Sequence, residues 1–243
     1  MWYRFLEKLH NKILFLLGFG NPDMRANGEL RALSYVKSRL SLSGSGKMVV
    51  FDVGANVGEY SRAVLDIFPE ADLYLFEPQK ELFAKLSKEF TNVFKLGLSD
   101  KAGVGPIYGN KDKKGLASLY NRNLEHFNLE LAKQEDVELG TVSGFCAGRK
   151  ISRIHLLKLD VEGHELRVLE GAKEMFGNID FIQFEFGGCN IDSKTFFQDF
   201  WRLLSKRYKI YRITGGGLRE INRYEERNEI FLTSNYLAEI KKK

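Results

Sequence analysis

Two short motifs in the second half of the chain carry side chains that could move a proton. The motif "KLDVEGHE" contains Asp160, Glu162 and His164, and "FIQFEFGG" contains Glu185. An imidazole or a carboxylate can accept the proton of a hydroxyl group, and a histidine has the ordinary pKa nearest to neutrality. We therefore predict these four residues as the catalytic groups, with His164 as general base and Asp160 or Glu162 orienting its ring.

Other interpretations of the same residues stay open. Glu162 could cap the helix that follows it, and His164 could support a neighbour instead of reacting. Glu185 would become a better base if burial raised its pKa, or it could face outward and pair with an arginine. The carboxylates of Asp160, Glu162 and Glu185 could also bind a divalent cation, but our prediction is a site without metal.

The turn "DVGANVG" has the residue types of a binding loop between a buried strand and a helix. Gly54 and Gly58 allow the backbone to approach a ligand closely, and Asn56 replaces the middle glycine of the dinucleotide motif G-x-G-x-x-G. The Asp52 carboxylate at the strand end would repel a pyrophosphate but accept hydrogen bonds from an ammonium. The loop therefore favours a ligand with a zwitterionic amino-acid end, such as S-adenosylmethionine.

Polar residues also follow the next two predicted strands. Glu77 lies 25 residues after Asp52, a spacing at which an acid can bind both ribose hydroxyls of an adenosine cofactor. Ser99 and Asp100 end the third strand and could flank an adenine. Taken singly, Asp52 or Asp100 could cap a helix or a turn, and Glu77 could be solvated. Their order along successive strands favours the cofactor.

The elements that must position these residues alternate along the chain. The pattern predicts strands at 49–53, 72–77, 92–98, 154–161 and 180–186, and helices after Gly58, Gln79, His164 and Ser193. This alternation is typical of an α/β fold, a Rossmann-like, doubly wound and mostly parallel sheet with ligands at the carboxyl ends of its strands. The runs "KIYRI" and "NEIFLTS" predict an antiparallel pair at the C-terminal edge.

Two segments depart from this alternation. Residues 108–150 predict a polar, irregular insertion with one helix at about 123–133. Aromatic and polar side chains of this insertion could contact a sugar: Tyr120, Asn121, Arg122, His126 and Phe127. The predicted domains are an N-terminal helical segment, 1–45, and a catalytic domain, 46–243, that contains the insertion.

The N-terminal segment 1–20 predicts an amphipathic helix. Its apolar residues recur at helical spacing, and basic residues lie largely opposite. Its longest uncharged stretch, 13–20, is too short to cross a bilayer. Such a helix packs on its own domain or on a homodimer partner, or it lies on the inner face of a membrane.

Composition limits the classes of function. The 243 residues include 44% hydrophobic and 28% charged residues, with a formal net charge of +5. Because the basic residues form no stripe with interleaved aromatics, we predict no nucleic-acid partner. Cys146 and Cys189 lack the spacing of a metal site, which favours buried thiols and the cytoplasm.

Four motifs together resemble a known family. The strings "FDVGANVGEYS", "FEPQ", "LGLSD" and "LLKLDVEGHELRVLEGA" are similar to the FkbM-type family of S-adenosylmethionine-dependent methyltransferases, over about residues 49–188. The family positions that would hold the cofactor are Asp52, Gly54, Asn56, Gly58, Glu77, Ser99 and Asp100, and Ala55, Tyr60 and Pro78 lie in the same motifs. One departure is "TVSGFC", where Ser143 and Gly144 replace a more usual acidic pair.

The resemblance implies a class I methyltransferase-like fold and methyl transfer, usually to a hydroxyl of a sugar or a polyketide. We therefore expect a small-molecule or glycan acceptor. Two alternatives stay open: an NAD-dependent oxidoreductase or epimerase on a Rossmann fold, and a non-catalytic protein that binds S-adenosylmethionine. The missing third glycine and the presence of Asp52 count against the first alternative.

Overall fold

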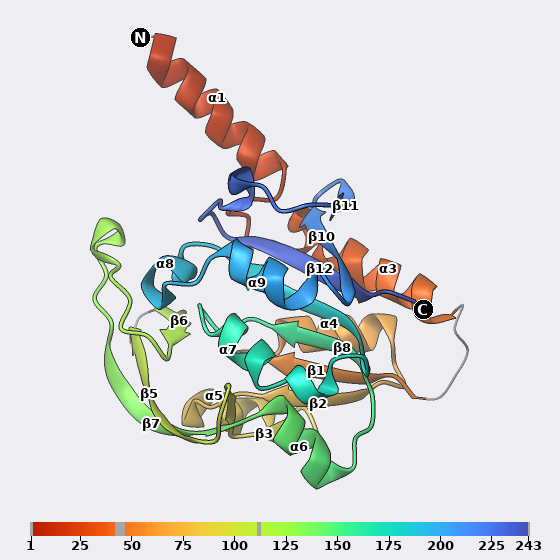
Figure 1. Cartoon of the computed structure of the whole chain (residues 1–243). Coiled ribbons are helices and arrows are strands. Elements are labelled where there is room, and N and C mark those ends of the chain that lie inside the picture. The colour runs from red at the N-terminus through yellow and green to blue at the C-terminus, as the bar shows by residue number, and fades with distance from the viewer. Residues whose placement is uncertain (1, 42–46, 111–112, 243) are drawn as a thin grey trace.

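An eight-stranded, mostly parallel sheet forms the centre of the molecule (Figure 1). The computed structural model describes residues 2–41, 47–110 and 113–242. The strand order is β11 (Gly217–Ile221), β10 (Tyr208–Thr214), β12 (Ser234–Ile240), β9 (Ile179–Phe186), β8 (Ile154–Leu159), β1 (Val49–Val53), β2 (Asp72–Phe76) and β3 (Val93–Phe94). Strand β1 pairs in parallel with β2 and β8, and β8 with β9, which confirms the predicted doubly wound fold.

Helices cover both faces of this sheet because its buried strands are apolar on both sides. One face packs against α3 (Glu29–Ser41), α4 (Glu59–Ile67) and α5 (Lys80–Leu86), and the other against α6 (Val142–Arg149), α7 (Glu165–Glu170) and α9 (Phe197–Leu204). Successive residues of β1 alternate between the two cores, since Val50 packs with α3 and α4 while Phe51 packs with α6 and α7. The predicted crossover helices are confirmed, and a short α8 (Cys189–Ser193) precedes α9.

The prediction that residues 108–150 are irregular with one helix was wrong, whereas their being an insertion stays a prediction. This region contributes to a second sheet of order β4 (Gly97–Leu98), β7 (Ala132–Gly140), β5 (Gly103–Asn110) and β6 (Lys113–Ser118). In place of the predicted helix at 123–133 there is one 3-10 turn, Glu125–Phe127. Only Val137 of β7 is buried. The strand therefore lacks the alternation of apolar and polar residues from which a strand is predicted. The predicted third strand, 92–98, is also divided between the two sheets.

The C-terminal edge differs from its prediction in one strand. Strand β10 contains "KIYRI" as predicted, but "NEIFLTS" is not a strand, and Leu232 within it is exposed. The last strand is β12, whose residues are buried because it inserts antiparallel between β9 and β10. The antiparallel edge therefore has three strands, β12, β10 and β11.

The N-terminal segment forms three helices of different burial. Helix α1 (Trp2–Leu16) projects away from the body, whereas α2 (Met24–Asn27) and α3 lie against it (Figure 1). Helix α3 contributes Ala32, Leu33 and Val36 to a core that it shares with α4 and β1. Among the described residues, no helix is both long and apolar enough to cross a membrane. The division into domains at residue 45 stays a prediction.

Candidate functional site

A cavity of about 660 Å³ opens at the carboxyl ends of β1, β2, β8 and β9. This size suits a small-molecule ligand. Its wall includes segments from both ends of the chain and from the second sheet: Gly20–Pro22, Asn27, Glu29, Val53, Gly54, Asn56, Phe76–Gln79, Leu96–Leu98, Ile107, Gly115–Leu119, Arg122, Phe127, Leu139, Asp160–Glu162, His164, Glu185, Cys189, Thr233 and Asn235.

The turn between β1 and α4 has a backbone that only particular residues adopt. Gly54 has a φ of +83°, and a Cβ there would lie 1.9 Å from the Asp160 carbonyl oxygen. Asn56 has a φ of 49°, a left-handed conformation that asparagine tolerates. The turn therefore needs glycine at position 54, where its backbone packs against the Asp160 backbone at the end of β8. Gly54 and Asp160 both line the cavity.

Glu77 at the end of β2 is held by the backbone on two sides. Its Oε2 accepts a hydrogen bond from the Asn56 amide and its Oε1 accepts one from the Gln79 amide, both at 2.9 Å. Burial raises the pKa of Glu77 to about 7, and the two backbone hydrogen bonds oppose that shift. Glu77 and Pro78 line the cavity, so the carboxyl group is fixed where a ligand hydroxyl could meet it.

The other predicted cofactor residues of the first turn lie behind the cavity wall. Asp52 is buried and accepts a hydrogen bond from the Ser61 hydroxyl at 2.6 Å, and burial raises its pKa to about 6. The Tyr60 hydroxyl donates to Gln183 at 2.9 Å. The cavity lining includes none of Asp52, Ala55, Gly58 and Tyr60. The sequence-based expectation that Asp52 faces the ligand therefore differs from the structure, because Asp52 ties the turn to α4.

His164 is held between two hydroxyl groups. Its Nε2 lies 2.9 Å from the Ser99 Oγ and its Nδ1 lies 3.1 Å from the Tyr120 hydroxyl. Burial lowers the pKa of His164 to about 4. The carboxylates expected to orient this ring, Asp160 and Glu162, have other partners. Ser99 and Asp100 do not line the cavity, although Ser99 contacts His164, which does.

The predicted acids gather at the ends of β8 and β9. Asp160 pairs with the buried Lys158 at 3.0 Å, and Glu162 pairs with the Arg122 guanidinium. Burial raises the pKa of Glu162 to about 8. Burial, together with the neighbouring acids, raises the pKa of Glu185 well above its ordinary value. The cavity therefore contains acids whose pKa values are raised by burial, and such groups are candidates for proton transfer.

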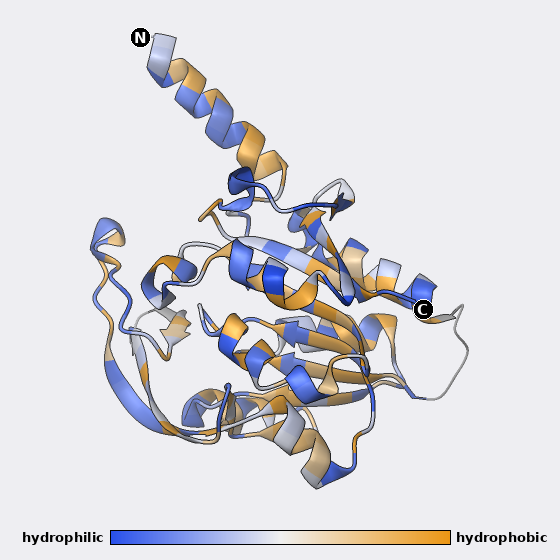
Figure 2. Ribbon diagram, in the orientation of Figure 1, coloured by the Kyte–Doolittle hydropathy of each residue, from blue (hydrophilic) through white to orange (hydrophobic). Residues whose placement is uncertain are grey.

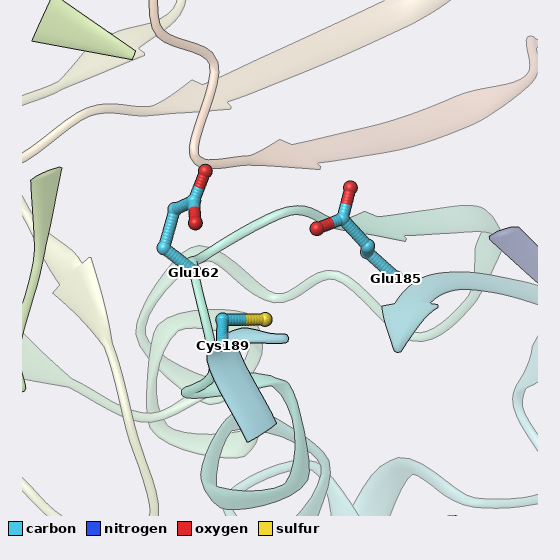
Figure 3. Close-up of side chains that lie close together, drawn as sticks. All are labelled: Glu162, Glu185 and Cys189. Carbon is cyan, nitrogen blue, oxygen red and sulfur yellow. The ribbon is translucent and has the colours of Figure 1, made fainter. Parts of the chain in front are cut away.

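A small cluster in the same wall combines carboxylates with a thiol. Ligand atoms of Glu162, Glu185 and Cys189 all lie within 4.8 Å of one another, and the side chains converge from β9, α8 and the turn after β8 (Figure 3). Burial raises the pKa of the Cys189 thiol. A cation there would have to displace the Arg122 guanidinium from Glu162 and a proton from Cys189.

Sequence analysis missed an amide network on the N-terminal side of the cavity. Glu29 accepts hydrogen bonds from the side-chain amides of Asn27 at 2.7 Å, Gln183 at 2.8 Å and Asn235 at 3.2 Å. Glu29, Asn27 and Asn235 line the cavity. The dipeptide Asn27-Gly28 before a helix is a turn signal, but nothing local indicates that Asn235 meets it.

Comparison with known proteins identifies the family. A model described as the methyltransferase FkbM domain matches residues 52–212. The chain belongs to the FkbM methyltransferase family. This membership confirms the predicted resemblance to methyltransferases that use S-adenosylmethionine. The roles of individual residues stay predictions.

Relatives of this FkbM-family chain include two enzymes with named acceptors or positions. It is 26% identical to the 2-O-methyltransferase NoeI of Sinorhizobium fredii, in a match covering 57% of this chain and 63% of that protein. It is 25% identical to the hexuronic acid methyltransferase AglP of Haloferax volcanii, over 73% of this chain and 68% of that protein. The chain therefore spans about two thirds or less of these relatives.

A solved structure is also similar to this FkbM-family chain. The plantazolicin methyltransferase BpumL in complex with SAH is 12% identical, with a TM-score of 0.46 over 91% of this chain and 87% of that chain.

Proposed function

We propose that this protein is an O-methyltransferase that moves a methyl group from S-adenosylmethionine to a hydroxyl group of a sugar. The observation that carries the proposal is one cavity that joins Glu77 and the Gly54 turn to the protonatable acids Glu162 and Glu185. The relative NoeI, a 2-O-methyltransferase, supports transfer to an oxygen, and the relative AglP, a hexuronic acid methyltransferase, supports a sugar acceptor.

The residues of the first turn fit the cofactor. Glycine at position 54 lets the turn pack against the Asp160 backbone at the edge of the cavity, and Glu77 offers carboxylate oxygens to the ribose hydroxyls. Glu29 and Asp160 line the same cavity, and their side chains would face the cofactor's ammonium and sulfonium groups. When bound, the cofactor supplies a methyl group on a positively charged sulfur, ready for in-line displacement by an oxygen.

Glu185 is the general base in this proposal. It lines the cavity, and its raised pKa matches a group that accepts a proton from a hydroxyl. Glu162 is less suitable because Arg122 already pairs with its carboxylate. His164 is less suitable because both ring nitrogens meet hydroxyl groups and its pKa is lowered. The acceptor's proton would pass to the Glu185 carboxylate while its oxygen gains the methyl group.

The insertion forms the acceptor side. Phe127 is exposed yet lines the cavity, and an aromatic face can stack on the apolar face of a sugar ring. Arg122 of the insertion also lines the cavity and adds hydrogen-bonding groups. A sugar can thus bind by stacking and hydrogen bonds while its reacting hydroxyl meets Glu185.

Calorimetric titration tests the cofactor half of this proposal. S-adenosylmethionine should bind saturably, and Glu77→Gln should weaken binding about a hundredfold, because a charged acceptor contributes roughly 1.5–3 kcal/mol to a hydrogen bond. Glu70→Gln, at an exposed position, is the matched control. Binding of NAD in place of the methyl donor would contradict the proposal.

Turnover tests the acceptor half. Incubation with the donor and a panel of mono- and oligosaccharides, followed by mass spectrometry, should detect a methylated sugar. Donor binding without methylation of any acceptor would favour the alternative of a non-catalytic binding protein.

A further inference from the structure

Helix α1 has an apolar face that no other described part of the chain covers. Its 15 residues, Trp2–Leu16, include none that is buried. The apolar stripe comprises Trp2, Phe5, Leu6, Leu9, Ile13 and Leu16, which recur at the spacing of one helix face and are all exposed, Trp2 to 74% and Leu16 to 68%. Figure 2 shows this helix with orange and blue sides, standing apart from the body.

Basic residues run along one border of this stripe. Arg4, Lys8 and Lys12 are spaced four residues apart, so they form one row beside the apolar residues, and Glu7 is the only acid of the helix. An apolar stripe beside a row of cations matches the surface of an anionic bilayer, where acyl chains lie beneath negatively charged headgroups. In an antiparallel pair of α1 helices the two basic rows would face each other and repel.

The base of α1 is fixed to the wall of the cavity. Phe19 is buried under the Arg212 guanidinium, which lies 4.1 Å from its ring centroid. The Gly20 amide donates a hydrogen bond to the Thr233 carbonyl oxygen at 2.7 Å. Gly20, Asn21, Pro22 and Thr233 all line the cavity. A partner that binds α1 therefore also determines the direction in which this side of the cavity faces.

We propose that α1 docks on an anionic lipid bilayer and thereby presents the cavity to an acceptor held at the membrane surface. The docking surface is the apolar stripe together with Arg4, Lys8 and Lys12. The acceptor class that fits is a sugar attached to a lipid. This second half rests on the proposed methyl transfer, whereas bilayer binding does not.

Vesicle flotation of the full chain tests the docking. The probes are vesicles of equal parts phosphatidylcholine and phosphatidylglycerol, compared with vesicles of phosphatidylcholine alone. We expect binding to the anionic vesicles and much weaker binding to the neutral ones. The double variant Lys8→Gln, Lys12→Gln should bind about thirtyfold more weakly, because each basic side chain near an anionic surface contributes roughly a fivefold factor.

Charge-matched variants of the same helix separate its two faces. Leu9→Glu places a carboxylate in the apolar stripe and should abolish vesicle binding. Asn11→Glu places the same carboxylate on the polar face and should retain most of it. Equal losses in both variants, or no binding of the unaltered chain to anionic vesicles, would overturn the proposal. So would a dimer in sedimentation equilibrium that Leu9→Glu dissociates without any vesicle binding by the unaltered chain.

A parallel titration with S-adenosylmethionine distinguishes the two proposals. Leu9→Glu should bind the donor with unchanged affinity, because position 9 lies outside the cavity. Vesicle binding without donor binding would leave the docking in place and remove the methyl transfer. Donor binding without vesicle binding would remove the docking and leave the methyl transfer in place.

Discussion

By residue type alone, His164 would be a stronger base than Glu185. The surroundings of the two side chains reverse this order. An ordinary histidine titrates near neutrality and an ordinary glutamate does not. Burial moves both pKa values, to about 4 for His164 and well above its ordinary value for Glu185. Because burial penalises whichever form is charged, the imidazole stays neutral and the carboxyl group holds its proton. The carboxylate thereby becomes the stronger base.

Replacing Glu185 should therefore remove catalysis with little effect on cofactor binding. We expect Glu185→Gln to lower kcat about a hundredfold or more, the usual effect of losing a general base. In the unaltered protein kcat should rise with pH, because the base acts only after losing its proton. Donor affinity by calorimetry should stay within a few-fold. Glu174→Gln, at an exposed position, is the control, and an unchanged kcat in Glu185→Gln would assign the base elsewhere.

Replacing His164 should have a smaller effect and leave the shape of the pH profile intact. Its pKa of about 4 lies below the range in which kcat would be measured, so its titration cannot contribute to a profile between about pH 5 and pH 8. We expect His164→Gln to keep kcat within about tenfold, with the same profile. A profile that loses its ascending limb in this variant would make His164 the base after all.

At the scale of elements, the turn between β8 and α7 makes the stability of the fold depend on pH. Glu165 is fully buried, and its Oε1 accepts hydrogen bonds from the Val161 amide at 2.9 Å and the Gly163 amide at 3.2 Å. Its Oε2 has no hydrogen-bond partner among the described residues. Burial raises the pKa of Glu165 from 4.5 to about 7. The folded state therefore prefers the protonated carboxyl group, which leaves no uncompensated charge on Oε2.

This preference predicts the sign of a stability change. Stability contributed by protonated Glu165 is present below about pH 4.5 and is lost as the pH rises through about 7. Glu165→Gln keeps an oxygen for the two amides and cannot ionise. In urea denaturation, the variant should lose less free energy of unfolding than the unaltered protein between about pH 5 and pH 8, by up to about 3 kcal/mol. Equal pH dependence in both proteins would contradict the raised pKa of Glu165; Glu174→Gln serves as control.

The sequence predicted those helices and strands whose apolar residues recur with a regular period. The runs 49–53, 154–161 and 180–186 are rich in β-branched, leucine and phenylalanine residues, and their parallel pairing follows from the helices between them. Strand β7 has a polar surface and depends on β5 for its hydrogen bonds. Nothing in its own nine residues indicates that pairing.

The same distinction applies to the site. Glu77 could be predicted because a strand end places it at the sheet edge, where it does line the cavity. Asp52 could not be placed, since the choice between facing a ligand and accepting from Ser61 depends on side-chain packing. Glu29 was missed because its partners Gln183 and Asn235 are distant in sequence. Sequence thus predicts which residues end strands, and tertiary packing decides where each side chain points.

At the scale of the whole molecule, the cavity draws its wall from nearly the full length of the described chain. Gly20 and Glu29 come from the N-terminal segment, Phe127 from the insertion, and Thr233 and Asn235 from the C-terminal edge. Helix α3 belongs to this assembly, because Ala32, Leu33 and Val36 are at most 1% exposed in the core shared with α4. The N-terminal helices therefore divide by burial: α1 stands outside the core and α3 is part of it.

Two truncations distinguish this division from a domain boundary at residue 45. Deleting residues 2–16 should leave the free energy of unfolding unchanged, because α1 has no buried residue. Deleting residues 2–41 should unfold the protein or nearly so. It removes four buried core side chains, of which Phe19, Leu33 and Val36 each contribute about 1.5–3 kcal/mol, from a total stability of about 5–15 kcal/mol. It also leaves the amides of Gln183 and Asn235 without Glu29. Circular dichroism during urea denaturation measures both effects. If the shorter chain unfolds at the same urea concentration as the full one, α3 is dispensable and the boundary at 45 is correct.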